Sequence, residues 1–175
     1  PYQHDDIRGI WIHGPPGVGK SHLARAHGEL LGGFYTKAQN KWWDGYDGEP
    51  VVVMDDFDQQ GVCLAHHIKI WSDKYPFKGE CKGSHVEARH REFIITSNYS
   101  IDDLFPKELD ENLHAALTRR FRVIHIPERS CYPDELSLVI DSNKYLSANE
   151  RAREGKPVGF VSDTLACGPN FVAPK

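Results

Sequence analysis

The sequence predicts an α/β fold in which a parallel sheet is covered by helices. Short apolar runs alternate with helix-compatible stretches, a glycine-rich segment GPPGVGKS follows the first apolar run, and a later apolar run ends in two acids. This alternation is typical of βαβ units, whose strands lie parallel in one sheet. Five strands with this spacing fit a compact P-loop ATPase core.

Each element is predicted from its apolar run and from the residues that end it. The Gly32-Gly33 pair ends the first helix, because glycine adopts the left-handed conformation that terminates helices. We expect strands at 9–13, 34–36, 51–55, 92–96 and 123–126, and helices at 20–31, 64–74 and 106–119.

Two stretches interrupt this alternation. Residues 75–91 contain Pro76 and two glycines among alternating polar and apolar residues, which predicts an inserted β-hairpin with its tip at 82–84. After residue 127 the pattern weakens, with one amphipathic helix expected at 143–153. We therefore expect an ATPase core at 1–127 and a C-terminal appendage at 128–175, partly mobile at its end.

Composition excludes several classes of protein. The 175 residues carry a net charge of −4, so the surface as a whole is not a nucleic-acid footprint and any contact with DNA or RNA must be local. The four cysteines form no CxxC pair, which argues against a zinc ribbon and a disulfide framework and indicates an intracellular protein. The sequence shows no signal peptide and no apolar run long enough to span a membrane.

The segment GPPGVGKS has the order of residues that binds a nucleoside triphosphate. Its glycines let successive backbone N–H groups converge on phosphate oxygens at the start of a helix. Lys20 supplies a cation for the β- and γ-phosphates, and the Ser21 hydroxyl is placed to ligate Mg²⁺. The predicted ATP-binding residues are Gly14, Pro15, Pro16, Gly17, Val18, Gly19, Lys20, Ser21 and His22.

Two acids end the apolar run 51–54, as in a buried strand that delivers carboxylates to the carboxyl edge of a parallel sheet. We expect Asp55 to hold Mg²⁺ through water and Asp56 to polarise the attacking water. Taken alone, the pair also fits a buried strand that ends in two solvated acids. The GPPGVGKS segment favours the catalytic interpretation.

The motifs NKWWDGYDGEPVVVMDDF, ECKGSH, FIITSN and ALTRRF follow the phosphate loop in that order. This series resembles the helicase domain of the replication-associated (Rep) proteins of circoviruses and related circular single-stranded DNA viruses, which are superfamily 3 helicases of the AAA+ type. The resemblance covers residues 9–126. It implies an AAA+-type core that hydrolyses ATP to unwind DNA during rolling-circle replication.

The resemblance also implies roles for residues outside the phosphate loop. Asn98 matches the sensor that orients the lytic water, although an Asn after a strand also caps turns. Arg120 matches the arginine finger that reaches a neighbouring subunit's nucleotide. Arg119 is the adjacent candidate, and we expect one of the two arginines to be a structural ion-pair partner.

The expected hairpin is the most basic part of the chain and matches the segment that grips DNA in these ring helicases. Lys82 corresponds to its tip, and we include Gly83 and His85 in the nucleic-acid contact. A solvated, charged hairpin is the alternative. A zinc site built on Cys81, His85 and His90 lacks an evident fourth ligand.

The aromatic residues Trp42, Trp43 and Tyr46 allow two interpretations. They could stack on bases, but clustered aromatics so near a buried strand are more often packed in a core or an interface, and we favour packing.

The resemblance further implies partners and a location. We expect single-stranded DNA or unwinding duplex as substrate, a hexameric ring in the full protein, and action in the host cell nucleus. Family members carry an N-terminal nicking endonuclease and an oligomerisation segment, whereas eight residues precede the first expected strand here. We therefore assign no nicking to this chain and expect it to be largely monomeric in dilute solution. The alternatives are an RNA-directed helicase and a P-loop ATPase that remodels a protein partner.

Overall fold

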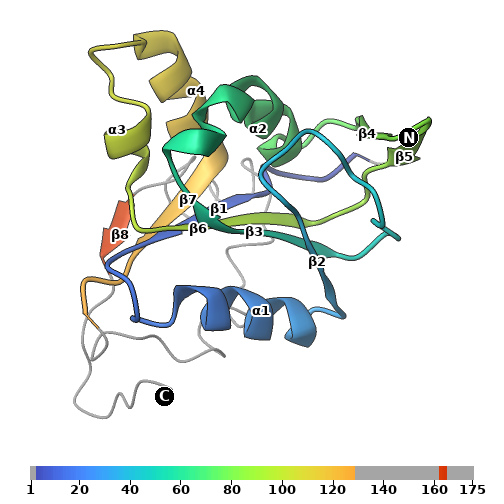
Figure 1. Ribbon diagram of the computed structural model, residues 1–175, viewed down its shortest axis with the longest axis horizontal. Helices are drawn as coiled ribbons and strands as arrows, with labels where there is room; N and C mark the ends of the chain where they lie inside the picture. The colour runs from blue at the N-terminus through green and yellow to red at the C-terminus, as the bar shows by residue number, and fades with distance from the viewer. Residues whose placement is uncertain (1–2, 129–161, 165–175) are drawn as a thin grey trace.

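The computed structural model describes residues 3–128 and 162–164. Its main sheet has six strands, all parallel, in the order β2-β3-β6-β1-β7-β8 (Figure 1). The strands are β1 (Gly9–His13), β2 (Phe34–Thr36), β3 (Val51–Phe57), β6 (Glu92–Ser97), β7 (Phe121–His125) and β8 (Ser162–Thr164). The five expected strands are present, which confirms the expected P-loop NTPase class with an AAA+-type core, and β8 adds a sixth at the β7 edge.

Helices cover both faces of this sheet. The helix α1 (Lys20–Leu30) lies on one face, and α2 (Ala65–Ser72), α3 (Ile101–Leu104) and α4 (Glu111–Arg120) lie on the other (Figure 1). A short 3₁₀ helix, η1 (Gln59–Leu64), leads into α2. Because side chains alternate along a strand, each buried strand supplies both faces.

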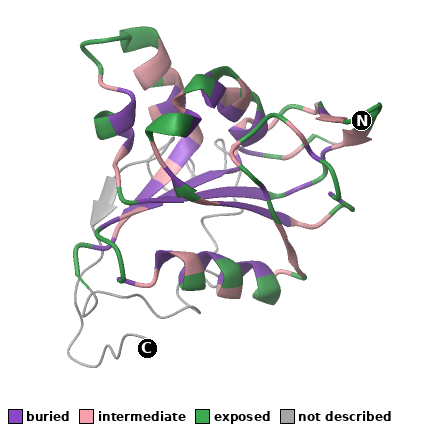
Figure 2. Ribbon diagram, viewed as in Figure 1, coloured by how far each residue is buried: buried purple, intermediate pink, exposed green. Residues whose placement is uncertain are grey.

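Two apolar clusters result from this alternation. Ile10 and Ile12 of β1 pack with Leu23 of α1, whereas Trp11 between them packs with residues of the other three helices. Figure 2 shows the central strands β3, β6 and β1 as the most buried part of the described molecule. The parallel strands β3, β6 and β1 therefore form the buried centre of the sheet, and the phosphate loop follows the carboxyl end of β1.

Several element boundaries differ from those expected. The helix expected at 106–119 begins only at Glu111, where the Asp110 side chain caps it by accepting from Leu113 N at 3.0 Å. Helix α3, which begins with a capping box formed by Ser100 and Asp103, was not expected from the sequence. The helix expected at 64–74 splits into the end of η1 and α2. The helix expected at 143–153 lies outside the described residues.

The inserted hairpin is present at the expected place. Strands β4 (Lys78–Cys81) and β5 (Ser84–Glu87) pair antiparallel, with Lys82 and Gly83 in the turn. Gly83 has φ 83°, a conformation that glycine adopts without strain. The hairpin precedes β6, so it lies at the amino edge of the sheet, away from the phosphate loop (Figure 1).

Candidate nucleotide site and nucleic-acid hairpin

The phosphate loop connects the carboxyl end of β1 to the first turn of α1. Gly17 and Gly19 have φ of 81° and 98°, and Gly19 is the N-cap of α1. A Cβ on Gly14 would lie 2.1 Å from the carbonyl oxygen of Ile126, so only glycine fits there. The loop backbone therefore has the conformation that directs N–H groups toward an anion at a helix N-terminus.

Lys20 links this loop to the neighbouring strand. Its Nζ donates to the carbonyl oxygens of Gly14 and Pro15, both at 2.8 Å, and to Asn98 Oδ1 at 3.1 Å. All three acceptors are neutral, and Lys20 is only 6% exposed. Burial lowers the pKa of Lys20, because the charged form loses hydration, and the charge of Asp56 opposes this shift. An anion placed here would compensate a cation that is already buried.

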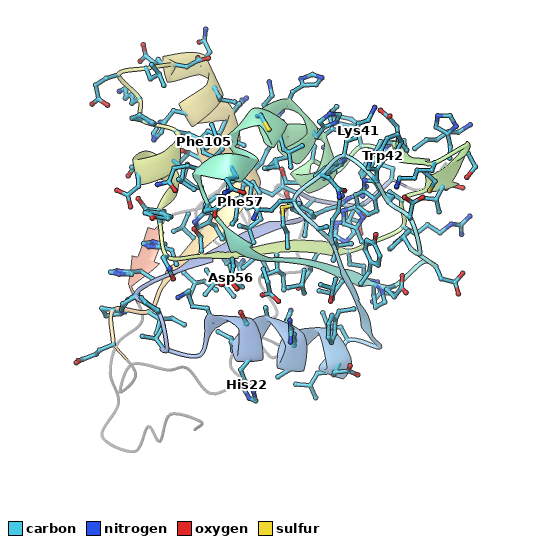
Figure 3. All side chains as sticks on the ribbon, in the orientation of Figure 1. His22, Lys41, Trp42, Asp56, Phe57 and Phe105 are labelled. Carbon is cyan, nitrogen blue, oxygen red and sulfur yellow. The ribbon has the colours of Figure 1, made fainter. Side chains whose placement is uncertain are left out.

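The two acids of β3 lie in different surroundings. The strand is irregular between Met54 and Phe57, and Asp56 there has φ 52°. Figure 3 shows Asp56 and Phe57 on opposite sides of the sheet, with Asp56 on the α1 side. Asp55 accepts from Arg25 at 2.7 Å and from Thr96 Oγ1 at 3.0 Å. The exposed Asp56 is therefore open to a ligand, whereas Asp55 is bonded within the chain.

A pocket of about 290 Å³ lies where these elements meet. Asp56 is on its wall, whereas Asp55 is not. The wall thus combines a hydroxyl, a carboxylate, an amide and a buried cation, a donor set that fits a triphosphate with Mg²⁺ held by Ser21 and an acid of β3. The lining residues are Pro16, Gly17, Gly19, Lys20, Ser21, His22, Asp56 and Asn98.

Arg120 lies at the opposite edge of the sheet from this pocket. It is the last residue of α4, and the next residue, Phe121, pairs with Gly9 at the amino end of β1. The phosphate loop follows the other end of β1, about 13 Å away along the strand. Arg120 Nε and one terminal nitrogen donate to Asp73 Oδ2 at 3.1 and 3.0 Å. The neighbouring Arg119 is exposed.

The hairpin presents basic side chains at the amino edge. Lys82 and His85 are exposed, as are Lys78 and Arg91. Both hairpin acids take part in ion pairs: Glu80 with Lys41 at 2.9 Å and Glu87 with Arg89 at 3.3 Å.

The residues considered for zinc do not form a site. His90 is buried and bonds through Nε2 to the carbonyl of Trp71 at 2.8 Å. Within residues 3–128, no three His, Cys, Asp or Glu side chains gather as a metal site would require. The described Cys63 and Cys81 are free thiols.

The sequence of this chain matches a known protein family. The family model described as RNA helicase matches residues 10–99, about half of the chain. The chain belongs to the RNA helicase family.

Sequence similarity to viral replication proteins specifies the type of helicase domain more closely. It is 42% identical to the replication-associated protein of Beak and feather disease virus, over 63% of this chain and 35% of that protein. With the same protein of Porcine circovirus 1 the identity is 45%, over 50% of this chain and 27% of the relative. With that of Human associated cyclovirus 1 it is 32%, over 70% and 43%. The chain is a circovirus-like Rep helicase domain and spans less than half the length of these relatives.

Two of the three aromatic side chains in the NKWWDGY motif are packed in the core rather than exposed to solvent. Trp43 is fully buried and Tyr46 is 6% exposed, and both belong to the core cluster on the α2 side. Trp42 is half-buried, with Lys41 Nζ 4.5 Å from the centre of its ring. The structure therefore supports packing for Trp43 and Tyr46.

Three residues that hold the site were not predicted from the sequence. Thr96 Oγ1 donates to Asp55 and accepts from Asp56 N at 3.1 Å, and it lies within the FIITSN motif, which was the signal available. Arg25, one turn after Ser21 on α1, pairs with Asp55. Gln39 Nε2 donates to the carbonyl oxygen of Asp56 at 3.3 Å, and nothing in the local sequence indicates this contact.

None of the helices that the structure describes is long and apolar enough to cross a bilayer.

Proposed function

We propose that this helicase domain hydrolyses ATP to translocate on single-stranded DNA and unwind duplex, as part of a viral replication initiator in rolling-circle replication. The observation that carries the proposal is the hydrogen bond from Lys20 to Asn98. It joins the phosphate loop to the end of β6 and places an amide beside the cation that meets the γ-phosphate.

The proposed roles follow from the pocket wall. The loop backbone and Lys20 bind the phosphates, and Asn98 orients the attacking water. Asp56 polarises that water, because it is the acid of β3 that lines the pocket. Bound Mg²⁺ supplies charge neutralisation, with Ser21 and, through water, Asp55 as its holders. Asp55 must exchange part of its bonding with Arg25 to take that role.

The hairpin is the proposed DNA contact. Its exposed cations are separated from the pocket by the length of the sheet, so nucleotide and strand can be held at once (Figure 1). Contacts between such cations and the phosphate backbone are electrostatic and do not depend on the base sequence of the DNA. The match to a family described as RNA helicase favours RNA as the second candidate substrate.

Assembly into a hexameric ring, in the host nucleus, belongs to the same proposal. An arginine at the end of α4 is too far from its own pocket and can act only on the nucleotide of another subunit.

The test is ATP hydrolysis with no nucleic acid, with single-stranded DNA and with single-stranded RNA, followed by strand separation on matched DNA and RNA duplexes. We expect hydrolysis to rise with DNA and to vanish in Lys20→Ala. Stimulation by RNA alone would select the RNA-directed helicase. Hydrolysis that responds to neither nucleic acid would overturn the proposal and favour an ATPase that acts on proteins.

A further inference from the structure

One loop of the helicase domain is hydrogen-bonded both to Asp56, a residue of the pocket wall, and to the hairpin. Residues 37–46, called here the connecting loop, follow β2 and arch over the α2 side of the sheet (Figure 1). Figure 3 shows Lys41 and Trp42 in this loop at the hairpin end of the molecule, well apart from Asp56. Hydrogen bonds of this loop therefore link two regions that the sheet holds apart.

At the pocket end, Gln39 bonds to the backbone on both sides of Phe57. Its Nε2 donates to the carbonyl oxygen of Asp56 at 3.3 Å, and its Oε1 accepts from Asp58 N at 3.4 Å. Asp56 is on the pocket wall and has a left-handed backbone conformation that is unusual for a residue other than glycine. A ligand that moves the Asp56 carboxylate therefore acts on a backbone segment that Gln39 holds.

At the hairpin end, the connecting loop bonds to β4 and to the turn. Trp43 N donates to the carbonyl oxygen of Glu80 at 2.8 Å, and Asp44 Oδ1 accepts from Lys82 N at 3.0 Å. A Cβ on Gly79 would lie 2.6 Å from the Trp43 ring, so β4 packs directly on the indole. Lys82 is the residue proposed to contact a phosphate, and its own backbone is held by this loop.

Between the two ends, a buried lysine bonds to the backbone of the loop. Lys37 Nζ donates to the carbonyl oxygens of Asn40 and Trp42 at 2.7 and 2.6 Å. It lies 5.3 Å and 4.5 Å from the ring centres of Trp43 and Trp71, and it is 1% exposed. Burial lowers the pKa of Lys37 to about 8. A cation between two indoles is attracted to both rings, so it fixes the loop between them.

We propose that the connecting loop couples nucleotide binding at Asp56 to the position of the hairpin tip, with Gln39 and Asp44 as the positioning residues at its two ends. The inference rests on the proposed function, because it needs both a nucleotide and a nucleic acid. Coupling between two sites is reciprocal: the factor by which nucleotide changes affinity for DNA equals the factor by which DNA changes affinity for nucleotide.

The test measures that factor in both directions. A non-hydrolysable ATP analogue with Mg²⁺ and a short single-stranded DNA serve as ligands, and the dissociation constant of each is determined with and without the other. In the parent we expect a factor of about 5 or more, within the usual range for coupled sites. In Gln39→Ala and in Asp44→Ala we expect it to fall within about twofold of one.

Matched controls separate coupling from general damage. Gln59→Ala removes another exposed glutamine beside β3, and Asp47→Ala removes another exposed aspartate next to the connecting loop. Both controls should keep the parent's factor. If Gln39→Ala and Asp44→Ala keep it as well, or if the parent binds both ligands with a factor of one, the coupling is overturned and the proposed function stands. A parent that binds neither ligand overturns both.

A second measurement needs no nucleic acid. Hydrogen exchange at the amides of residues 79–82 reports the hairpin directly, because Lys82 N–H bonds to Asp44. Nucleotide should change the exchange rate of these amides in the parent and in Gln59→Ala, and leave it unchanged in Gln39→Ala. Equal changes in all three proteins would contradict a path through Gln39.

Discussion

The two neighbouring carboxylates of β3 should give distinct variants, because their surroundings differ. Asp56→Asn keeps the phosphate contacts and removes the group that polarises water, so we expect nucleotide binding close to that of the parent with turnover lowered by about 10²-fold or more. Asp55→Asn should also weaken Mg²⁺ binding. Calorimetric titration with Mg²⁺ and nucleotide, beside steady-state turnover, separates the two outcomes.

Asp55→Asn should in addition destabilise the fold slightly. It removes the charge paired with Arg25 and weakens the bond with Thr96. Because Arg25 is half exposed, the ion pair contributes little, and a total loss of about 1 kcal/mol is expected in chemical denaturation. Equal Mg²⁺ affinity in the two variants would show that the two acids do not divide the roles in this way.

A buried histidine gives the domain a pH-dependent stability. Burial, reinforced by the charge of Arg8, lowers the pKa of His90 to about 3, against 6.5 for an ordinary histidine. The unfolded chain therefore binds more protons between these values, so stability is complete above pH 6.5 and decreases as pH falls. The slope is about 1.4 kcal/mol per pH unit for one such group. His13, whose pKa burial lowers to about 4, acts in the same direction.

Thermal unfolding from pH 7.5 down to pH 5 tests this prediction. His90→Gln should show a weaker dependence of Tm on pH than the parent, whatever its absolute Tm. His66→Gln, which changes an exposed histidine, should keep the parent's dependence. A His90→Gln curve parallel to that of the parent would contradict the assignment.

At the scale of elements, the hairpin provides the next prediction. If Lys82 contacts a phosphate, Lys82→Ala should weaken DNA binding. The logarithm of the DNA association constant should then fall less steeply with the logarithm of the salt concentration, with a slope smaller in magnitude by about one. Lys107→Ala serves as the control, because Lys107 is also exposed but lies beside α4 and pairs with Glu111 at 3.8 Å. An unchanged slope in Lys82→Ala would make Lys82 an ordinary solvated charge.

The elements predicted best are those whose signals are local. Strands β1 and β2 have the expected bounds: glycines mark the start and the end of β1, and the Gly32-Gly33 pair marks the start of β2. The capping box at Ser100 was also a local signal, and α3 could have been found from it. The strand β8 could not, because its three residues form a strand only by pairing with β7 about 40 positions earlier.

In the candidate site too, features with a local sequence signal were predicted, and features that depend on strand pairing were not. The sequence motif sufficed to propose the phosphate loop and its lysine, and residues of the loop and Lys20 line the pocket that the structure contains. The strand irregularity that turns Asp56 onto the pocket wall and leaves Asp55 bonded to Arg25 depends on pairing with β6, which a strand pattern does not reveal.

At the scale of the whole molecule, the two arginines that end α4 should differ. Arg120 bonds to Asp73, so Arg120→Ala should lower stability, whereas the exposed Arg119 is free to reach another subunit. We expect Arg119→Ala to lose turnover by about 10³-fold with an unchanged Tm. Turnover of the parent should also rise with protein concentration.

Mixing variants tests whether the site is shared. Arg119→Ala and Lys20→Ala should each be inactive alone and should recover activity together, because a mixed assembly pairs an intact loop with an intact arginine. Recovery with Arg120→Ala instead would assign the trans role to that residue. No recovery with either, and turnover that does not depend on concentration, would contradict a shared site.

The central claim is that the phosphate loop, Asp56 and Asn98 form one nucleotide site around a buried lysine. Isothermal titration of Mg²⁺-ATP analogue into the parent, Lys20→Ala and the surface control Lys107→Ala tests it most directly. We expect one site per chain in the parent and the control, and affinity at least about 10-fold weaker in Lys20→Ala with its Tm without ligand preserved. Equal affinity in all three proteins would contradict the claim.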